Sequence, residues 1–166
     1  MYQRPYLNDM ETMKVKAQDL FALTEELFLM GNDVQIRVTG NSMLPFLHHE
    51  RDCVQLTKVP YEEIRVADIV LAIRKDGAYI LHRVFTKDTD SFYMVGDAQD
   101  YLDGPYPKEK LVAKVTVLFR KGKHIDCRHI GYRFLVRVWM MMRPWRRIVF
   151  AVYRKTKGIF SASKRQ

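Results

Sequence analysis

The sequence predicts a mainly β protein with flanking helices, an α+β arrangement built on one antiparallel β-domain. Between about residues 33 and 127, short runs rich in β-branched and aromatic residues alternate with Gly, Pro and Asp turn signals. These signals recur about every eight to twelve residues, which is typical of antiparallel strands. The chain has 166 residues, of which 48% are hydrophobic, so it is long and apolar enough to bury a core.

An amphipathic helix is predicted in the N-terminal segment, residues 1–32. Apolar residues recur there near helical spacing, at Met13, Leu20, Phe21, Leu23, Leu27 and Phe28. Gly31 is a typical stop at the C-terminal end of such a helix. Interspersed charges such as Lys16 and Glu25 argue against a membrane span and against the apolar core of a signal peptide. We therefore expect neither feature in this segment.

The β-domain is expected to span residues 33–128 as one unit. Its strand-like runs are, in order, VQIRV, DCVQLTKV, DIVLAIR, AYILHRVF, SFYMV and LVAKVTVLF. Breaks are expected at GNSMLP, VPYEE, KDG, KDTD and DGPYP. The chain has only two cysteines, Cys53 and Cys127, and no His pair at ligand spacing. The sequence therefore predicts no disulfide framework, no metal site and no cofactor.

Charge divides the chain into two unequal parts. Residues 1–118 contain 14 Lys and Arg against 18 Asp and Glu, a net charge of −4. Residues 119–166 contain 14 Lys and Arg against one Asp, a net charge of +13, so the whole chain carries +9. Such a break is typical of a globular domain followed by a basic segment that meets a polyanion or an anionic surface.

The basic segment, residues 129–166, contains a predicted amphipathic helix in residues 132–154. An apolar stripe recurs at intervals of three and four residues, at Phe134, Val138, Met141, Trp145, Val149 and Val152. Arginines interrupt each apolar run well before the roughly 20 residues that a membrane span needs. Pro144 should kink or divide the helix. Three interpretations stay open: binding to an anionic membrane surface, packing on the β-domain or, least favoured, contact with nucleic acid.

The polar residues of the β-domain include a candidate nucleophile and candidate partners for it. Ser42 lies in TGNSMLPFL, between a strand-like run and a turn. His82 lies among apolar residues in AYILHRVF, and Asp97, Asp100 and Asp103 share the loop VGDAQDYLDGPYP. Each alone has an ordinary structural explanation, such as bonding of a loop backbone. Together they supply the hydroxyl, base and carboxylate of a serine hydrolase.

The order of these segments resembles that of the type I signal peptidases. GNSMLP resembles the serine box of this family, in which Ser-Met precedes a proline. DCVQLTKVPYEEIRVADIVLAI resembles the next stretch, with Ala67 in place of the usual glycine. LHRVF is similar to the His-Arg-Val segment of the endoplasmic-reticulum type and its archaeal and Gram-positive relatives, and VGDAQDYLD to their Gly-Asp-Asn-Asn box. The resemblance covers roughly residues 34–118 and implies a signal-peptidase-like antiparallel catalytic domain.

The resemblance also implies roles for individual residues. Ser42 would be the nucleophile, His82 the general base and Asp103 the carboxylate that orients or supports the base. Asp97 would be structural or supporting, and which of the two aspartates contacts His82 stays open. The Asn-Asn positions of the box are Ala98 and Gln99, which departs from the family pattern.

Neighbouring residues are expected to shape the site. Gly40 would let the backbone turn and approach a substrate closely, and Met43 would line the groove or the core. The backbone N–H of Ser42 is the expected oxyanion donor. Arg83 alternates with His82 and is expected to form a structural ion pair, whereas Lys87 would face away from the site.

The function that the resemblance implies is a serine endopeptidase that cuts leader or signal peptides after small residues. Its expected partners are a peptide or protein precursor, an anionic membrane surface and an integral membrane protein that supplies an anchor. Its expected location is cytoplasmic or peripheral to a membrane. One alternative is a self-cleaving, repressor-like protein, which would use a Lys base and would need a DNA-binding segment before the catalytic domain. The other alternative is an inactive module that keeps the fold and binds peptides.

Overall fold

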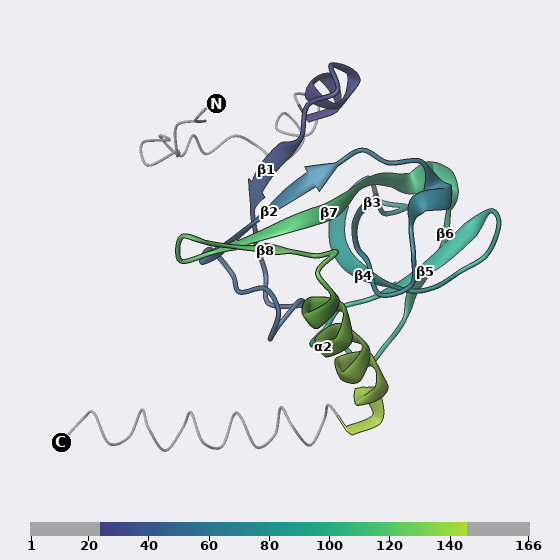
Figure 1. Cartoon of the computed structure of the whole chain (residues 1–166). Helices are drawn as coiled ribbons and strands as arrows, with labels where there is room; N and C mark the ends of the chain where they lie inside the picture. The colour runs from purple at the N-terminus through teal and green to yellow at the C-terminus, as the bar shows by residue number, and fades with distance from the viewer. Residues whose placement is uncertain (1–23, 146–166) are drawn as a thin grey trace.

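The computed structural model describes residues 24–145, which form one antiparallel β-sheet with two helices (Figure 1). The eight strands are β1 (Val34–Arg37), β2 (Asp52–Thr57), β3 (Ile69–Ile73), β4 (Tyr79–Lys87), β5 (Ser91–Val95), β6 (Asp103–Pro107), β7 (Leu111–Arg120) and β8 (Lys123–Asp126). Residues 24–29 are helical, and α2 spans Ile130–Met141. Short 3₁₀ turns occupy Tyr61–Glu63, Lys108–Lys110 and Arg143–Trp145. The predicted class, mainly β with flanking helices, is confirmed.

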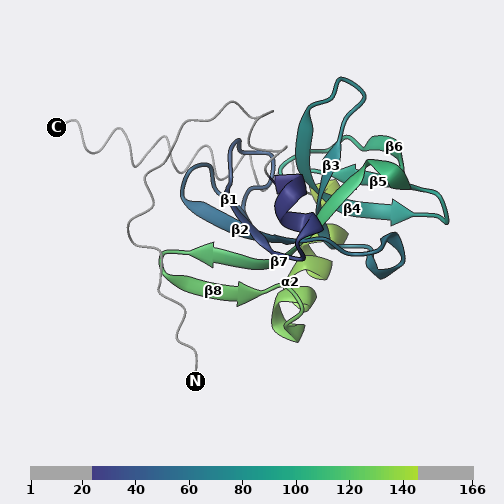
Figure 2. The same cartoon turned by 90° about the horizontal axis from the view of Figure 1, so that it is seen from above.

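The sheet is curved rather than flat. Its strands follow the order β1-β2-β7-β3-β4-β5-β6, and β8 pairs with β7. Register shifts interrupt the β2–β7, β3–β7, β4–β5 and β5–β6 pairings, and such bulges add twist and curvature. Figure 1 shows β3 to β6 curling round one end of the molecule. Figures 1 and 2 show helical residues 24–29 and α2 on opposite sides of the sheet.

Two hydrophobic clusters share β3 as a common wall. Ile69 and Leu71 pack into the first cluster, together with Met43 from the β1–β2 loop. Val70 and Ala72 pack into the second cluster, which lies among strands β3 to β6. Because successive side chains of a strand point to opposite faces, burial on both faces explains the uninterrupted apolar run IVLAI.

One predicted break turns out to be a strand. The segment DGPYP forms β6, which pairs with β5. The Tyr106 ring stacks on the Phe92 ring, with 5.7 Å between centroids, and this contact anchors the strand. Proline is tolerated because β6 lies at the end of the strand order, where a missing N–H need not interrupt an interior ladder.

Helix α2 ends three residues before Pro144, the residue at which the sequence predicts a kink or a division of the helix. It begins after His129, whose Nδ1 accepts a hydrogen bond from the Gly131 N–H at 3.2 Å. The α-helix ends at Met141, and a 3₁₀ turn follows it. The remainder of the predicted amphipathic segment, residues 146–154, lies outside the described residues.

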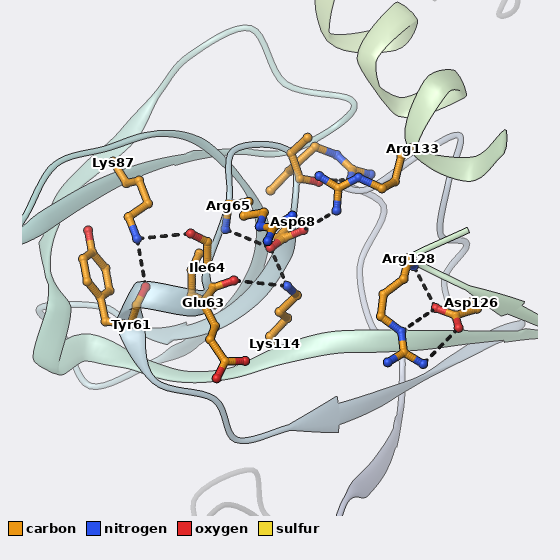
Figure 3. A network of polar contacts seen from close by, with 12 residues as sticks. Tyr61, Glu63, Ile64, Arg65, Asp68, Lys87, Lys114, Asp126, Arg128 and Arg133 are labelled. Atoms are coloured by element: carbon orange, nitrogen blue, oxygen red, sulfur yellow. Dashed lines mark hydrogen bonds and ion pairs between the residues drawn. The ribbon is translucent and has the colours of Figure 1, made fainter. Parts of the chain in front are cut away.

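One side of α2 packs on the β-domain. Val136 is buried, and the Trp139 indole donates a hydrogen bond to the Asp97 carbonyl at 3.2 Å. Arg133 lies 3.9 Å from the Asp68 carboxylate (Figure 3). These contacts fix the helix beside the loop that follows β5.

Between residues 24 and 145, no helix is long and apolar enough to cross a bilayer.

Candidate active site

Ser42 and His82 line one open groove, which has a volume of about 270 Å³. Ser42 begins a turn of residues 42–46 in the β1–β2 loop, and His82 lies within β4. The end of β3 and the β5–β6 loop complete the walls. The structure therefore places the predicted nucleophile and the predicted base on the same surface.

Ser42 is anchored in a way that leaves both of its donors free. Its carbonyl accepts a hydrogen bond from the Ala98 N–H at 2.8 Å. Within the described residues, neither its hydroxyl nor its backbone N–H makes a hydrogen bond. The half-buried serine can therefore present its hydroxyl to a substrate, and its N–H can stabilise an oxyanion.

His82 is buried and electrically neutral at physiological pH. Its side chain is only 2% exposed, and its Nδ1 has no hydrogen-bond partner within the described part of the chain. Burial lowers the pKa of His82 to about 4, against the opposing charges of Asp103 and Asp97, and Arg74 lowers this pKa further. A neutral imidazole can accept a proton from a serine hydroxyl.

Asp103 does not line the groove that contains Ser42 and His82. It lies at the start of β6 and lines a neighbouring groove of about 390 Å³ that also contains Tyr106. Its negative charge favours the protonated form of His82, but no hydrogen bond joins the two side chains. Burial and the nearby Asp103 carboxylate raise the pKa of Tyr106 to about 12. Asp103 thus acts on His82 through space in this structure.

Asp97 has a structural partner instead of the histidine. Its buried carboxylate accepts hydrogen bonds from Arg83 Nε at 2.9 Å and from Arg83 Nη2 at 2.6 Å. Arg83 also donates to the Ala67 carbonyl at 2.7 Å and lies over the Phe46 ring at 5.1 Å. Burial alone would disfavour the charge, but Asp97 raises the pKa of Arg83 above its usual value. The structural ion pair predicted for Arg83 is confirmed, and its partner is an aspartate of the acidic loop.

The same loop holds the Ser42 turn through Gly96 and Ala98. Gly96 is buried and lies so close to the turn that an added Cβ would be 2.7 Å from the Ser42 carbonyl oxygen. The Asp97–Arg83 pair therefore connects the strand that carries His82 to the turn that carries Ser42. Sequence reasoning did not single out Gly96; its only signal is a glycine between a strand-like run and an aspartate.

Gly40 precedes the turn and Met43 belongs to it, and both are held in place by the surrounding structure. Gly40 adopts a left-handed φ of 85°, a conformation that favours glycine, and its N–H donates to His49 Nδ1 at 3.0 Å. Met43 is 2% exposed and packs in the first hydrophobic cluster, and it also lines the groove. Both alternatives predicted for Met43, groove and core, therefore apply.

Lys87 takes no part in the groove. Figure 3 shows its ammonium group bonded to the carbonyls of Tyr61 at 2.8 Å and Ile64 at 3.1 Å. The ammonium also lies 4.2 Å from the centroid of the Tyr61 ring. None of the residues that line the Ser42 groove is a lysine. The groove therefore provides a histidine, and no lysine, as the candidate base.

No protein-family model matches this chain, and no curated protein matches it. Among residues 24–145, no three His, Cys, Asp or Glu side chains are grouped so that they could hold a metal ion. The chemistry of the groove is therefore inferred from its own residues.

Proposed function

We propose that this protein is a serine endopeptidase, similar in fold and chemistry to type I signal peptidases, that cuts leader or signal peptides after small residues. The observation that carries the proposal is the groove shared by Ser42 and His82. In this groove the serine has free donors and the histidine is neutral. The antiparallel sheet and the resemblance of four sequence segments also support it.

The reaction follows from these two side chains. Ser42 Oγ attacks the carbonyl carbon of the scissile peptide bond while His82 accepts the hydroxyl proton. The free Ser42 N–H donates to the oxyanion, and the negative charge of Asp103 stabilises the imidazolium through space. His82 then passes the proton to the leaving amine. A water molecule activated by His82 hydrolyses the acyl-enzyme and restores the free serine.

The first test compares the wild type with Ser42→Ala on a diverse peptide library, with cleavage read by mass spectrometry. We expect cuts after Ala-like residues that disappear in the variant. Ser91→Ala is the matched control, because Ser91 lies on β5 and does not line the groove. Cuts that persist in Ser42→Ala would exclude the proposed nucleophile.

A fluorophosphonate probe separates an enzyme from an inactive module that binds peptides. The probe should label Ser42 in the wild type and in Ser91→Ala. Labelling should be lost as the pH falls through about 4, where His82 becomes protonated.

A self-cleaving protein with a Ser-Lys pair is disfavoured because no lysine lines the groove. Absence of labelling together with tight peptide binding would favour the inactive module.

A second proposal concerns the outer face of α2 and the turn after it, which we define as Ile130, Phe134, Leu135, Val138, Met141, Met142 and Trp145. These apolar side chains are exposed, with Ile130 at 81%, Met141 at 80% and Phe134 at 69%. Four of them belong to the apolar stripe predicted from the sequence, so in the described residues that stripe faces outward. Arg137 beside them is exposed, and residues 119–166 carry a net charge of +13. An exposed apolar face with basic flanks is typical of a helix that lies on an anionic membrane.

Flotation with vesicles tests this membrane proposal. We expect binding to vesicles that contain phosphatidylserine, weaker binding to neutral vesicles, and loss of binding in a Phe134→Ser, Met141→Ser double variant. The control is Val66→Ser, which removes an exposed apolar side chain (47%) from a loop remote in sequence from the helix. Equal flotation of the wild type and the double variant would contradict a role for the outer face.

A further inference from the structure

Two arginines line the groove that contains Ser42 and His82. Arg37 lies at the end of β1, and Arg74 follows the last residue of β3. Both side chains are exposed. None of the residues that line this groove is an Asp or a Glu. The charge of the groove lining is therefore positive, although residues 1–118 as a whole carry a net charge of −4.

Neither arginine has a partner within the described residues. No ion pair and no side-chain hydrogen bond is formed by Arg37 or by Arg74. Asp76 and Asp103 line the adjacent groove with Arg74, but neither lies within ion-pair distance of it. Among the described residues, Arg51, Arg83, Arg120, Arg128 and Arg133 are paired with carboxylates, whereas Arg65, Arg137 and Arg143, like Arg37 and Arg74, form no such ion pair.

Unpartnered guanidinium groups beside a nucleophile are suited to bind a carboxylate of the substrate. A guanidinium presents five donors in a planar fork that matches a carboxylate. A peptide lying along the groove would bring side chains close to both arginines, because they line the same space as Ser42. The remaining walls include apolar side chains such as Ile36, Leu71 and Leu81, which suit the small or apolar residues of a peptide.

We propose that the groove selects peptides that carry acidic side chains close to the cleaved bond, and that Arg37 and Arg74 each recognise the carboxylate of one such side chain. This inference rests on the proposed peptidase function and specifies its substrate class. Because both arginines are exposed, each contact should contribute modestly, about fivefold in kcat/KM at low salt. The two arginines lie on different elements, so each should recognise a different position of the peptide.

The test uses peptides that share one small residue at the cleaved bond and carry Glu, Gln or Lys at each flanking position in turn. For the wild type we expect kcat/KM to fall in the order Glu, Gln, Lys at two positions, one for each arginine. Arg37→Gln and Arg74→Gln should each abolish the preference at one position. Arg74→Glu should reverse it, so that the Lys peptide becomes the better substrate. Arg65→Gln is the control, because Arg65 is exposed and does not line the groove.

A binding measurement separates this inference from the peptidase proposal. Fluorescence anisotropy of the same peptides with Ser42→Ala reports recognition without cleavage. Tighter binding of the Glu peptide that depends on Arg37 or Arg74 supports the inference even if no cleavage occurs, in which case only the peptidase proposal fails. Cleavage that depends on Ser42 but is equal for Glu, Gln and Lys would overturn the inference and leave the peptidase proposal intact.

Discussion

Two neighbouring residues of β4, His82 and Arg83, face opposite sides of the strand and differ in their hydrogen bonding. Both are buried, with exposures of 2% and 0%. The guanidinium of Arg83 is bonded to Asp97 and to the Ala67 carbonyl. The Nδ1 of His82 has no partner among the described residues. Because buried polar atoms are nearly always paired, this contrast supports a structural role for Arg83 and is consistent with the proposed catalytic role of His82.

The largest expected effect follows from removing the imidazole. His82→Leu should lower kcat/KM by about 10³-fold or more, because the serine loses its base. The free energy of unfolding should stay unchanged or rise, because an apolar side chain replaces one with an unpaired polar atom. Peptide cleavage and urea unfolding of the same variant measure the two effects. Full activity in a folded His82→Leu protein would remove His82 from the mechanism.

Changes to the Arg83–Asp97 pair, on the opposite side of β4, should lower stability. Asp97→Asn and Arg83→Met should each lower the free energy of unfolding by about 3–5 kcal/mol, because each leaves a buried charge without its partner. The double variant Arg83→Met, Asp97→Leu should lose less than the sum of the single changes. Asp90→Asn is the control, since its ion pair with Lys108 is exposed. A small effect of Asp97→Asn in urea unfolding would contradict the comparison.

The sequence is sufficient to predict the two sides of β4 but not the position of Asp103. Strand alternation in AYILHRVF separates His82 from Arg83, and the acidic loop provides the partner of Arg83. Asp103 reaches its place through the β4–β5 and β5–β6 registers, each of which contains a bulge. No local pattern encodes those shifts, so the sequence does not show that Asp103 lines an adjoining groove and influences His82 by its charge without a hydrogen bond.

Tertiary context also explains the elements that sequence patterns miss. The segment DGPYP forms an edge strand although its composition is typical of a turn, and the packing of Tyr106 on Phe92 stabilises this strand. The close approach of Gly96 to the Ser42 carbonyl joins residues that are far apart in the chain. The existence of strands in alternating apolar runs is a local property, whereas both of these features depend on which strands become neighbours.

The pH dependence of the free energy of unfolding provides a further test of the contrast between His82 and Arg83. The unfolded chain binds a proton at His82 below about pH 6.5, but the folded chain does so only below about pH 4. The unfolded state therefore holds more protons between these values, and the free energy of unfolding rises with pH across this window, by roughly 3 kcal/mol. His82→Leu should remove this rise. The wild-type minus variant difference in urea unfolding between pH 4 and 7 measures it.

Asp52 should change the free energy of unfolding in a different pH range from His82. Burial opposes ionisation of Asp52, but bonds from Arg51, the His48 N–H and Arg120 lower the pKa of Asp52 to about 2. Its stabilising effect is present above about pH 4 and is lost as the pH falls toward 2. The two groups therefore titrate in different windows. If wild type and His82→Leu showed the same profile above pH 4, the buried histidine would not be the cause.

The smallest expected effect tests the link between the two sides of β4. Gly96→Ala places a Cβ 2.7 Å from the Ser42 carbonyl and 2.5 Å from Gln99 Oε1, so one of these groups must move. We expect a loss of roughly 1–3 kcal/mol in the free energy of unfolding, and a fall in kcat/KM of at most about 10²-fold as the serine is displaced. Gly131→Ala is the control, because its Cβ meets only the His129 ring, at 3.3 Å.

Addition of Gln99→Ala to Gly96→Ala identifies which contact matters. The double variant removes the side-chain clash but keeps the new Cβ against the Ser42 carbonyl. Because a backbone oxygen held by the Ala98 N–H cannot rotate away as an amide side chain can, we expect activity to remain low. Recovery of wild-type activity would mean that Gln99 alone is disturbed. In that case the loop after β5 would hold the Asp97–Arg83 pair without determining the position of Ser42.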